Sequence, residues 1–204
     1  MNVAVLISGE GTNLQAILDY EKEWHQHSPC PFHVALVLSN RKEALGLRRA
    51  SNYKVPTVVV DPKEFQSRES FDEALIHHLE QHQIKLVVLA GFMRILTPLF
   101  VRKYYGRLLN IHPALLPQFP GTDAIQNALK AGVKKTGATV HFVDEGVDTG
   151  PIIKQEVVPV EQNDSLETLS QKIHSVEHRL YPEVIRLFGE GKIHLRGRNV
   201  RVDA

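Results

Sequence analysis

The chain has 204 residues, which is long enough for one domain with a full hydrophobic core. Its 24 Lys and Arg residues balance 23 Asp and Glu residues, so the net charge of +1 gives no basic field for nucleic acid or an anionic membrane. No apolar run reaches the roughly 18 residues of a membrane span, the N-terminus lacks the basic start of a signal peptide, and the single cysteine, Cys30, excludes an internal disulfide. We therefore expect a cytoplasmic protein that binds neither nucleic acid nor membrane.

Strands and helices alternate along the first half of the chain. Short apolar runs that end at turn residues predict strands, and apolar residues spaced three or four apart predict helices. The strands expected in this half are Asn2–Ile7, Val34–Leu38, Val55–Val60 and Lys85–Ala90, and the helices are Asn13–His25, Glu43–Tyr53 and Ser67–Gln83.

The second half changes character. We expect strands at Leu108–His112, Ala138–Val143 and Ile152–Val160, a short helix at Asp123–Lys130, a long helix at Ser165–Leu187 disturbed at Pro182, and a closing hairpin at Ile193–Asp203 that turns near Gly197. The regular alternation predicts an α/β fold with an open, mostly parallel twisted sheet. Continuously apolar strands indicate that helices cover both faces of the sheet.

The first motif, Ser8-Gly9-Glu10-Gly11-Thr12-Asn13, directly follows the first strand and opens the first helix. Glycines allow the backbone to approach an anion closely, and a helix start directs free N–H groups and a positive dipole end towards it. Thr12 or Asn13 could cap the helix or donate to a phosphate. The alternative is an ordinary tight turn. Because the full G-x-G-x-x-G pattern and a P-loop lysine are missing, a monophosphate is favoured over a dinucleotide.

The second motif is Asn110-Ile111-His112-Pro113-Ala114-Leu115-Leu116-Pro117. In a strand, Asn110 and His112 point to the same face, at the carboxyl end where open α/β sheets bind ligands. A core strand with two hydrogen-bonded polar residues is the alternative. The third motif is a strand that runs into the acidic loop Asp144-Glu145-Gly146-Val147-Asp148-Thr149-Gly150-Pro151, which would supply a proton acceptor near that donor pair.

The histidines outside these motifs give weaker signals. His78 and His82 are spaced as metal ligands can be, but no carboxylate or thiolate completes a set, so we expect no metal. His141 is interpreted as a structural residue within a strand. His174 and His178 share one face of the long helix beside Glu177, and a substrate role for them stays open.

These motifs, in this order and at these separations, together with Gly91-Phe92-Met93-Arg94-Ile95-Leu96, resemble the glycinamide ribonucleotide (phosphoribosylglycinamide) formyltransferase family. The resemblance extends from the first strand to Tyr181-Pro182. The segment from Asn110 to Pro117 and the later Asp-x-Gly-Pro loop are shared by the wider folate-dependent formyltransferases. The Ser8–Asn13 loop and the 91–96 segment point to the branch that acts in purine biosynthesis.

The resemblance implies transfer of a formyl group from 10-formyltetrahydrofolate, as co-substrate, to the amine of glycinamide ribonucleotide. It implies a single domain over 1–204, with a phosphate-binding half at 1–106 and a catalytic and folate-binding half at 107–204, in a monomer or homodimer. By resemblance, the catalytic residues are Asn110, His112 and Asp148, and the ribonucleotide contacts are Gly11, Thr12, Asn13 and Glu177. Residues implied in folate binding are Arg68, Met93, Arg94, Ile95, Leu96, Asp144, Glu145, Gly146 and Val147.

The sequence departs from the family pattern in two places. Many relatives carry a histidine after the Pro-Gly pair, where this chain has Thr122-Asp123. Glu10 occupies a position where a neutral residue is common, and we expect its carboxylate to point away from a phosphate.

Three other functions remain as alternatives. A methionyl-tRNA formyltransferase is expected to need a nucleic-acid-binding domain, and a formyl-folate hydrolase a regulatory domain ahead of the first strand, which here begins at residue 2. A non-catalytic nucleotide-binding regulator is disfavoured by the presence of Asn110, His112 and Asp148 together.

Overall fold

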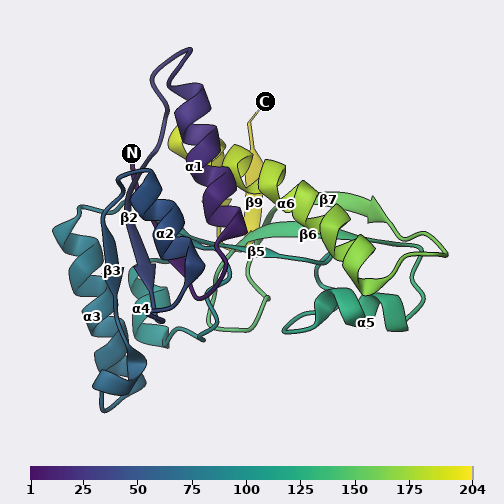
Figure 1. Cartoon of the computed structure of the whole chain (residues 1–204), viewed down its shortest axis with the longest axis horizontal. Coiled ribbons are helices and arrows are strands. Elements are labelled where there is room, and N and C mark those ends of the chain that lie inside the picture. The colour runs from purple at the N-terminus through teal and green to yellow at the C-terminus, as the bar shows by residue number, and fades with distance from the viewer. Residues whose placement is uncertain (204) are drawn as a thin grey trace. The chain divides into compact units, whose positions relative to one another are not determined.

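The structure is a computed structural model that describes residues 1–203. The chain divides into two compact units, Met1–Leu109 and a second unit that begins at Asn110. Figure 1 shows the helices and strands of each unit and labels them where there is room. The secondary structure of the first unit comprises β1 (Asn2–Ile7), α1 (Thr12–Trp24), β2 (His33–Ser39), α2 (Leu45–Asn52), β3 (Thr57–Val59), the 3-10 helix η1 (Pro62–Glu64), α3 (Arg68–Gln81), β4 (Leu86–Leu89) and α4 (Pro98–Lys103).

The strands of the first unit are ordered β3-β2-β1-β4, and each neighbouring pair is parallel. The chain moves in one direction from β1 to β3 and then returns to the other side of β1 for β4. Because crossovers between parallel strands are right-handed, α1 and α2 cover one face of these strands and α3 covers the other. The strand order therefore reverses between β1 and β4, which is the point where open α/β sheets bind ligands.

Local sequence explains the element boundaries in this unit. β1 is buried along almost its whole length, as its uninterrupted apolar run predicts. Helix α3 begins with a capping box, in which the side chains of Ser67 and Ser70 each bond the other's backbone N–H. The short elements η1 and α4 were not predicted. Both begin with a proline in the first helical turn, a position that tolerates its missing N–H.

The second unit holds the rest of β5 (Leu108–His112), which starts in the last residues of the first unit. It continues with α5 (Ala124–Lys130), β6 (Lys135–Phe142), β7 (Ile152–Pro159), α6 (Leu166–Gly189), β8 (Ile193–Arg196) and β9 (Asn199–Val202). Strands β5, β6 and β7 are neighbours in that order, and β6 and β7 are antiparallel. Strands β8 and β9 pair with each other as the expected hairpin.

Helix α6 packs on the β6–β7 pair and against α5 (Figure 1). Its buried Leu169 and Ile173 meet Val158 of β7 and form a hydrophobic core cluster in this unit. The helix continues through Pro182, where we had expected a disturbance, and ends at Gly189. The predicted α/β class, the mostly parallel strands, the long C-terminal helix and the closing hairpin are confirmed. Among residues 1–203, no helix combines the length and apolar character that a membrane span requires.

Candidate active site

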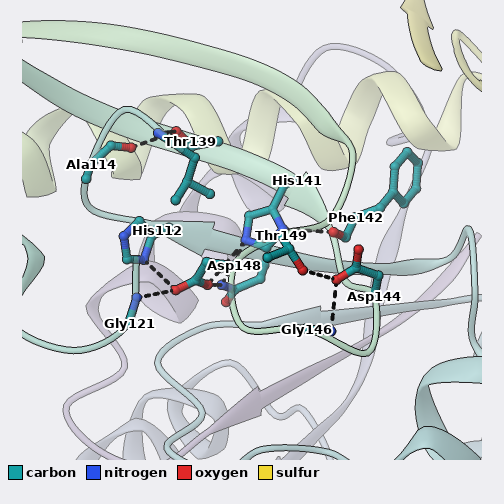
Figure 2. A network of polar contacts seen from close by, with 12 residues as sticks. His112, Ala114, Gly121, Thr139, His141, Phe142, Asp144, Gly146, Asp148 and Thr149 are labelled. Atoms are coloured by element: carbon teal, nitrogen blue, oxygen red, sulfur yellow. Dashed lines mark hydrogen bonds and ion pairs between the residues drawn. The ribbon is translucent and has the colours of Figure 1, made fainter. Parts of the chain in front are cut away.

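The strongest candidate site lies in the second unit, where β5 and β6 end. Asn110 and His112 extend from β5, and His112 is buried, with only 4% of its surface exposed. Asp148 lies in the loop that joins β6 to β7, and its side chain is 12% exposed. Figure 2 shows Asp148 at the centre of the polar contacts, with His112 and Gly121 on one side and His141 on the other.

The carboxylate of Asp148 has neighbours on both oxygens. Oδ2 accepts a hydrogen bond from the backbone N–H of Gly121 at 2.8 Å and lies 3.4 Å from Nδ1 of His112. Oδ1 lies 3.4 Å from the amide nitrogen of Asn110 and 3.6 Å from Nε2 of His141. The three residues predicted to be catalytic are thus brought together, and His141 joins them.

The hydrogen bonds around Asp148 keep it ionised. Burial by itself raises the pKa of this carboxyl, but the contact with His141, the Gly121 N–H and the charge of a protonated His112 outweigh burial. The pKa of Asp148 consequently lies below its ordinary value of about 3.8. At neutral pH the site contains a fixed negative charge beside two imidazole rings.

His112 has an oxygen acceptor at each ring nitrogen. Nε2 lies 2.7 Å from the backbone carbonyl oxygen of Phe119, and Nδ1 faces Asp148. Both contacts are favourable only when the ring carries a proton on each nitrogen. With a proton on both nitrogens, the ring can donate a hydrogen bond to a developing negative charge.

His141 and Asn110 form a second pair. Nδ1 of His141 lies 2.8 Å from the carbonyl oxygen of Phe142, so this nitrogen donates. Nε2 of the same ring lies 3.2 Å from the amide nitrogen of Asn110 and 3.6 Å from Oδ1 of Asp148. Asn110 is oriented by this contact and by Asp148.

Buried Thr139 fixes the segment that follows β5. Its hydroxyl donates to the carbonyl of Ala114 at 2.6 Å and accepts the N–H of Leu116 at 3.1 Å. Gln155 of β7 donates to the same hydroxyl and to the carbonyl of Leu116, both at 2.9 Å. These contacts hold Pro113–Pro117 in place, and with it the position at which the chain leaves His112.

The Ser8–Asn13 loop lies at the carboxyl end of β1 in the first unit. Gly11 adopts a left-handed conformation, with φ of 70°, and occupies the cap position of α1 without any side-chain cap. Of the two roles considered for Thr12 and Asn13, the structure gives the cap position to Gly11, because the helix already begins at Thr12. The first N–H groups of α1 consequently have no capping side chain from the cap residue, which is the arrangement that anions use at helix starts.

Close packing fixes this loop. A Cβ on Gly11 would lie 2.7 Å from Cα of Gly46, and the N–H of Gly46 donates to the carbonyl of Gly9 at 3.1 Å. Arg49 donates to the carbonyl of Glu10 at 2.8 Å, and the Glu10 side chain is exposed. Buried Ser8 donates to Asn40 and accepts the N–H of Met93 at 2.8 Å, so it is a structural member of the loop.

The 91–97 segment follows β4 in the same unit and holds four residues implied in folate binding. Met93 and Ile95 are 65% and 66% exposed, whereas Leu96 is buried. Arg94 stacks on the ring of Phe71, 4.7 Å from its centre, and Arg68 donates to the carbonyl of Ile95 at 2.7 Å. The segment thus presents two apolar side chains from a backbone that helix α3 holds.

Asp72 of α3 anchors the end of this segment. Its Oδ2 accepts both the N–H and the hydroxyl of Thr97, each at 2.6 Å, and the residue is 2% exposed. Burial raises the pKa of Asp72, and the Thr97 hydrogen bonds with Arg68 and Arg94 only partly offset that increase. No feature of the sequence identified this residue.

The other predicted ligand residues lie in the second unit. Glu177 is buried on α6, at 4% exposure. Glu145, Gly146 and Val147 are exposed on the β6–β7 loop, whereas Asp144 bonds within that loop. Within residues 1–203 no group of three or more His, Cys, Asp or Glu side chains is arranged to hold a metal ion.

The sequence pattern of the family described as formyl transferase matches residues 1–185. The chain belongs to the formyl transferase family. It is 45% identical to the phosphoribosylglycinamide formyltransferase of Escherichia coli (strain K12), over 95% of this chain and 89% of that protein. It is 48% identical to glycinamide ribonucleotide transformylase 1 from Symbiobacterium toebii, whose crystal structure superposes with a TM-score of 0.95 over 100% of this chain and 94% of the other.

A second group of formyl transferase relatives is much longer. The chain is 47% identical to the trifunctional purine biosynthetic protein adenosine-3 of Chironomus tentans over 96% of this chain. It spans only 14% to 19% of the length of such trifunctional relatives. Both groups are named for purine biosynthesis or for formyl transfer to phosphoribosylglycinamide, and the α/β fold matches that of the solved transformylases.

Sequence reasoning for this formyl transferase missed three parts of the site. His141 was interpreted as structural, although it is an alternate-position polar residue, with Thr139, in an otherwise apolar strand. That pattern is the one that singled out Asn110 and His112, so it could have found His141 as well. The Phe119 carbonyl and the Gly121 N–H are backbone groups, which carry no side-chain signal.

Proposed function

We propose that this protein transfers the formyl group of 10-formyltetrahydrofolate to the amine of glycinamide ribonucleotide, a step of de novo purine (IMP) biosynthesis. The single observation that carries the proposal is the placement of Asn110 and His112 around the carboxylate of Asp148. The names of the relatives support the choice of substrates. We extend the proposal to the whole chain as one catalytic domain, acting in the cytoplasm as a monomer or homodimer.

The reaction is an acyl transfer in which each atom is accounted for. The amine nitrogen attacks the formyl carbon and forms a tetrahedral intermediate with negative charge on the formyl oxygen. Collapse breaks the bond between the formyl carbon and N10 of the folate, and tetrahydrofolate leaves after N10 gains a proton. The amine loses one proton, so the products are formylglycinamide ribonucleotide and tetrahydrofolate. No metal is needed in this scheme.

The residues of the cluster have separate roles in this scheme. Protonated His112 and the amide of Asn110 donate hydrogen bonds to the negatively charged oxygen, which is where such donors lower a barrier most. The formyl oxygen replaces the Phe119 carbonyl as the acceptor of the Nε2 proton of His112. Asp148, ionised because its pKa is lowered, stabilises the imidazolium and receives the amine proton through a water molecule.

The remaining predicted residues bind the two substrates in this proposal. Gly11, Thr12 and Asn13 hold the ribonucleotide phosphate at the start of α1, and buried Glu177 contacts the ribonucleotide. The folate is bound by Arg68, Met93, Arg94, Ile95, Leu96 and the loop from Asp144 to Val147. Among them, Met93 and Ile95 present exposed apolar side chains.

The test is an assay of purified protein with 10-formyltetrahydrofolate, followed by the change in folate absorbance. One reaction contains glycinamide ribonucleotide, one contains no amine, and one contains methionyl-tRNA. The proposal expects folate conversion only with glycinamide ribonucleotide, and its loss in His112→Ala. Equal conversion without amine would identify a hydrolase, and conversion only with methionyl-tRNA a different transferase; both results overturn the proposal.

A further inference from the structure

The loop between β6 and β7 is organised around the side chain of Asp144. Its Oδ1 accepts the N–H of Gly146 at 3.1 Å and the hydroxyl of Thr149 at 2.6 Å, so one carboxylate bridges the two ends of the loop (Figure 2). Asp148 lies inside this span, one residue before Thr149. The direction of the Asp148 carboxylate therefore depends on the shape that Asp144 imposes.

The turn of the C-terminal hairpin reaches the same loop. Arg198 lies in the two-residue turn between β8 and β9, beside Gly197, whose φ of 60° permits the tight turn. Nη1 of Arg198 donates to Oδ2 of Asp144 at 3.0 Å, and Nη2 donates to the backbone carbonyl of Thr149. The planar guanidinium thus holds the first residue of the loop and the residue that follows Asp148 at the same time.

The loop has little room for another shape. A Cβ on Gly146 would lie 2.1 Å from the Thr149 hydroxyl, and one on Gly150 would lie 1.7 Å from the carbonyl oxygen of Phe142. Asp148 itself has φ of 54°, in the left-handed region that few residues other than glycine adopt. Such a backbone persists only where surrounding contacts fix it, and the contacts of Asp144 fix the loop on both sides of Asp148.

The charges of Asp144 and Arg198 strengthen the contacts that shape the loop. Burial raises the pKa of Asp144, but the bonds from Thr149, Arg198 and Gly146 outweigh this and hold the pKa below its ordinary value. Asp144 is therefore ionised at neutral pH, opposite a permanently charged guanidinium. Because the side chain of Arg198 is 66% exposed, the pair contributes little to global stability. Its effect falls on the loop.

We propose that Arg198 and Asp144 are positioning residues that latch the β6–β7 loop and thereby direct Asp148 towards His112 and Gly121. Both Asp144 oxygens bond groups of this chain, so Asp144 shapes the loop through these contacts. The link to catalysis rests on the proposed formyl transfer. The latch itself is a property of the loop and can be measured without any substrate.

The test compares Arg198→Ala with Arg201→Ala. Arg201 is on the same hairpin and also exposed, but it pairs with Asp203 and does not touch the loop. We expect amide hydrogen exchange at 144–150 to rise at least tenfold in Arg198→Ala and to stay unchanged in Arg201→Ala. The melting temperature should be the same in both. Turnover of Arg198→Ala should fall about tenfold, since small misplacements of a reacting group are costly.

Further variants distinguish a local effect on the loop from a general effect on folding. Arg198→Lys keeps the charge and should restore part of the exchange protection, whereas Asp144→Asn should resemble Arg198→Ala. The double variant should be no worse than Arg198→Ala alone, because both substitutions break one contact set. If amide hydrogen exchange at 144–150 in Arg198→Ala equals that in Arg201→Ala, the proposed latch is wrong. Faster exchange with unchanged turnover overturns its link to Asp148, and absence of wild-type transfer to glycinamide ribonucleotide instead refutes the proposed function.

Discussion

Replacing Asp148 with Asn removes the negative charge from the centre of the cluster while keeping its shape. Asn is among the few residues that tolerate the left-handed backbone found at Asp148, where φ is 54°, so the loop can keep its path. The carboxylate offers separate oxygens to the Gly121 N–H and to the Asn110 amide. An asparagine has only one such oxygen, so one of the two donors must face another donor.

The expected losses of stability and of turnover can both be estimated from these contacts. A hydrogen bond to a charged group contributes about 1.5–3 kcal/mol. We therefore expect Asp148→Asn to lower the free energy of unfolding by that amount. For a chain of this length, that corresponds to a fall of roughly 3–12 °C in melting temperature. Loss of general acid–base assistance should lower kcat by at least about a hundredfold. The loss of turnover is thus far larger than partial unfolding at assay temperature could explain.

The assay measures thermal unfolding and formyl transfer on one preparation. Asp123→Asn is the matched control, since Asp123 also has a left-handed backbone, with φ of 60°, but its side chain does not cap α5. It should change kcat by less than twofold. If Asp148→Asn keeps more than half of wild-type turnover while losing the expected stability, Asp148 is structural and the proposed mechanism is wrong.

The pH dependence of stability gives a second measurement on the same pair. The pKa of Asp148 is lowered in the folded protein, so its contribution is present above its ordinary value of about 3.8 and is lost as pH falls through the lower folded value. Asn does not titrate. The difference in unfolding free energy between wild type and Asp148→Asn, measured by urea unfolding, should therefore shrink as the pH falls below about 4. A difference that stays constant down to pH 3 would contradict the assigned charge state.

Substitutions at three further residues test other assigned roles. Gly11→Val should raise the KM for glycinamide ribonucleotide strongly, because its Cβ would meet Cα of Gly46 at 2.7 Å and the backbone is left-handed; unchanged KM in a folded variant would remove the phosphate role. Asp72→Ala should lower the free energy of unfolding in urea by about 2–5 kcal/mol, because the buried N–H and hydroxyl of Thr97 lose their acceptor. Asp72→Asn keeps an acceptor and should lower it by less than about 1 kcal/mol. Equal losses in the two variants would refute this role. His112→Ala should lower kcat by at least roughly a hundredfold with KM nearly unchanged, and normal turnover per folded molecule would overturn its catalytic role.

The sequence predicted the parts of the fold that depend on long periodic patterns. β1 and α3 were recognisable because an apolar run and a helical stripe each repeat over several residues. α4 was missed, since six residues are too few to display a period and the helix depends on Pro98 at its start. The cap of α1 was not identified from the sequence, because a left-handed glycine and an ordinary polar cap leave similar sequence signals.

The candidate site was predictable where polar side chains alternate along a strand. It was unpredictable where backbone groups of distant loops contact the site. Asn110 and His112 stood out as alternate polar residues, and the same rule applied to Thr139 and His141 would have found the fourth member. The Phe119 carbonyl reaches His112 only because the chain turns back after β5. Backbone acceptors of this kind follow from loop conformation, which residue types alone do not determine.

The contact between His112 and Phe119 explains how the proposed site can favour the transition state over the bound substrate. Every donor of the cluster already has an acceptor within the protein, so a substrate oxygen must replace one of them. A neutral formyl oxygen that displaces the neutral Phe119 carbonyl exchanges one hydrogen bond from the imidazolium for another, with little gain in binding. Once the amine has attacked, the oxygen itself is negatively charged, and the imidazolium attracts it more strongly than a neutral carbonyl. The exchange then becomes favourable only as the barrier is crossed, which is the condition for raising kcat without tightening substrate binding.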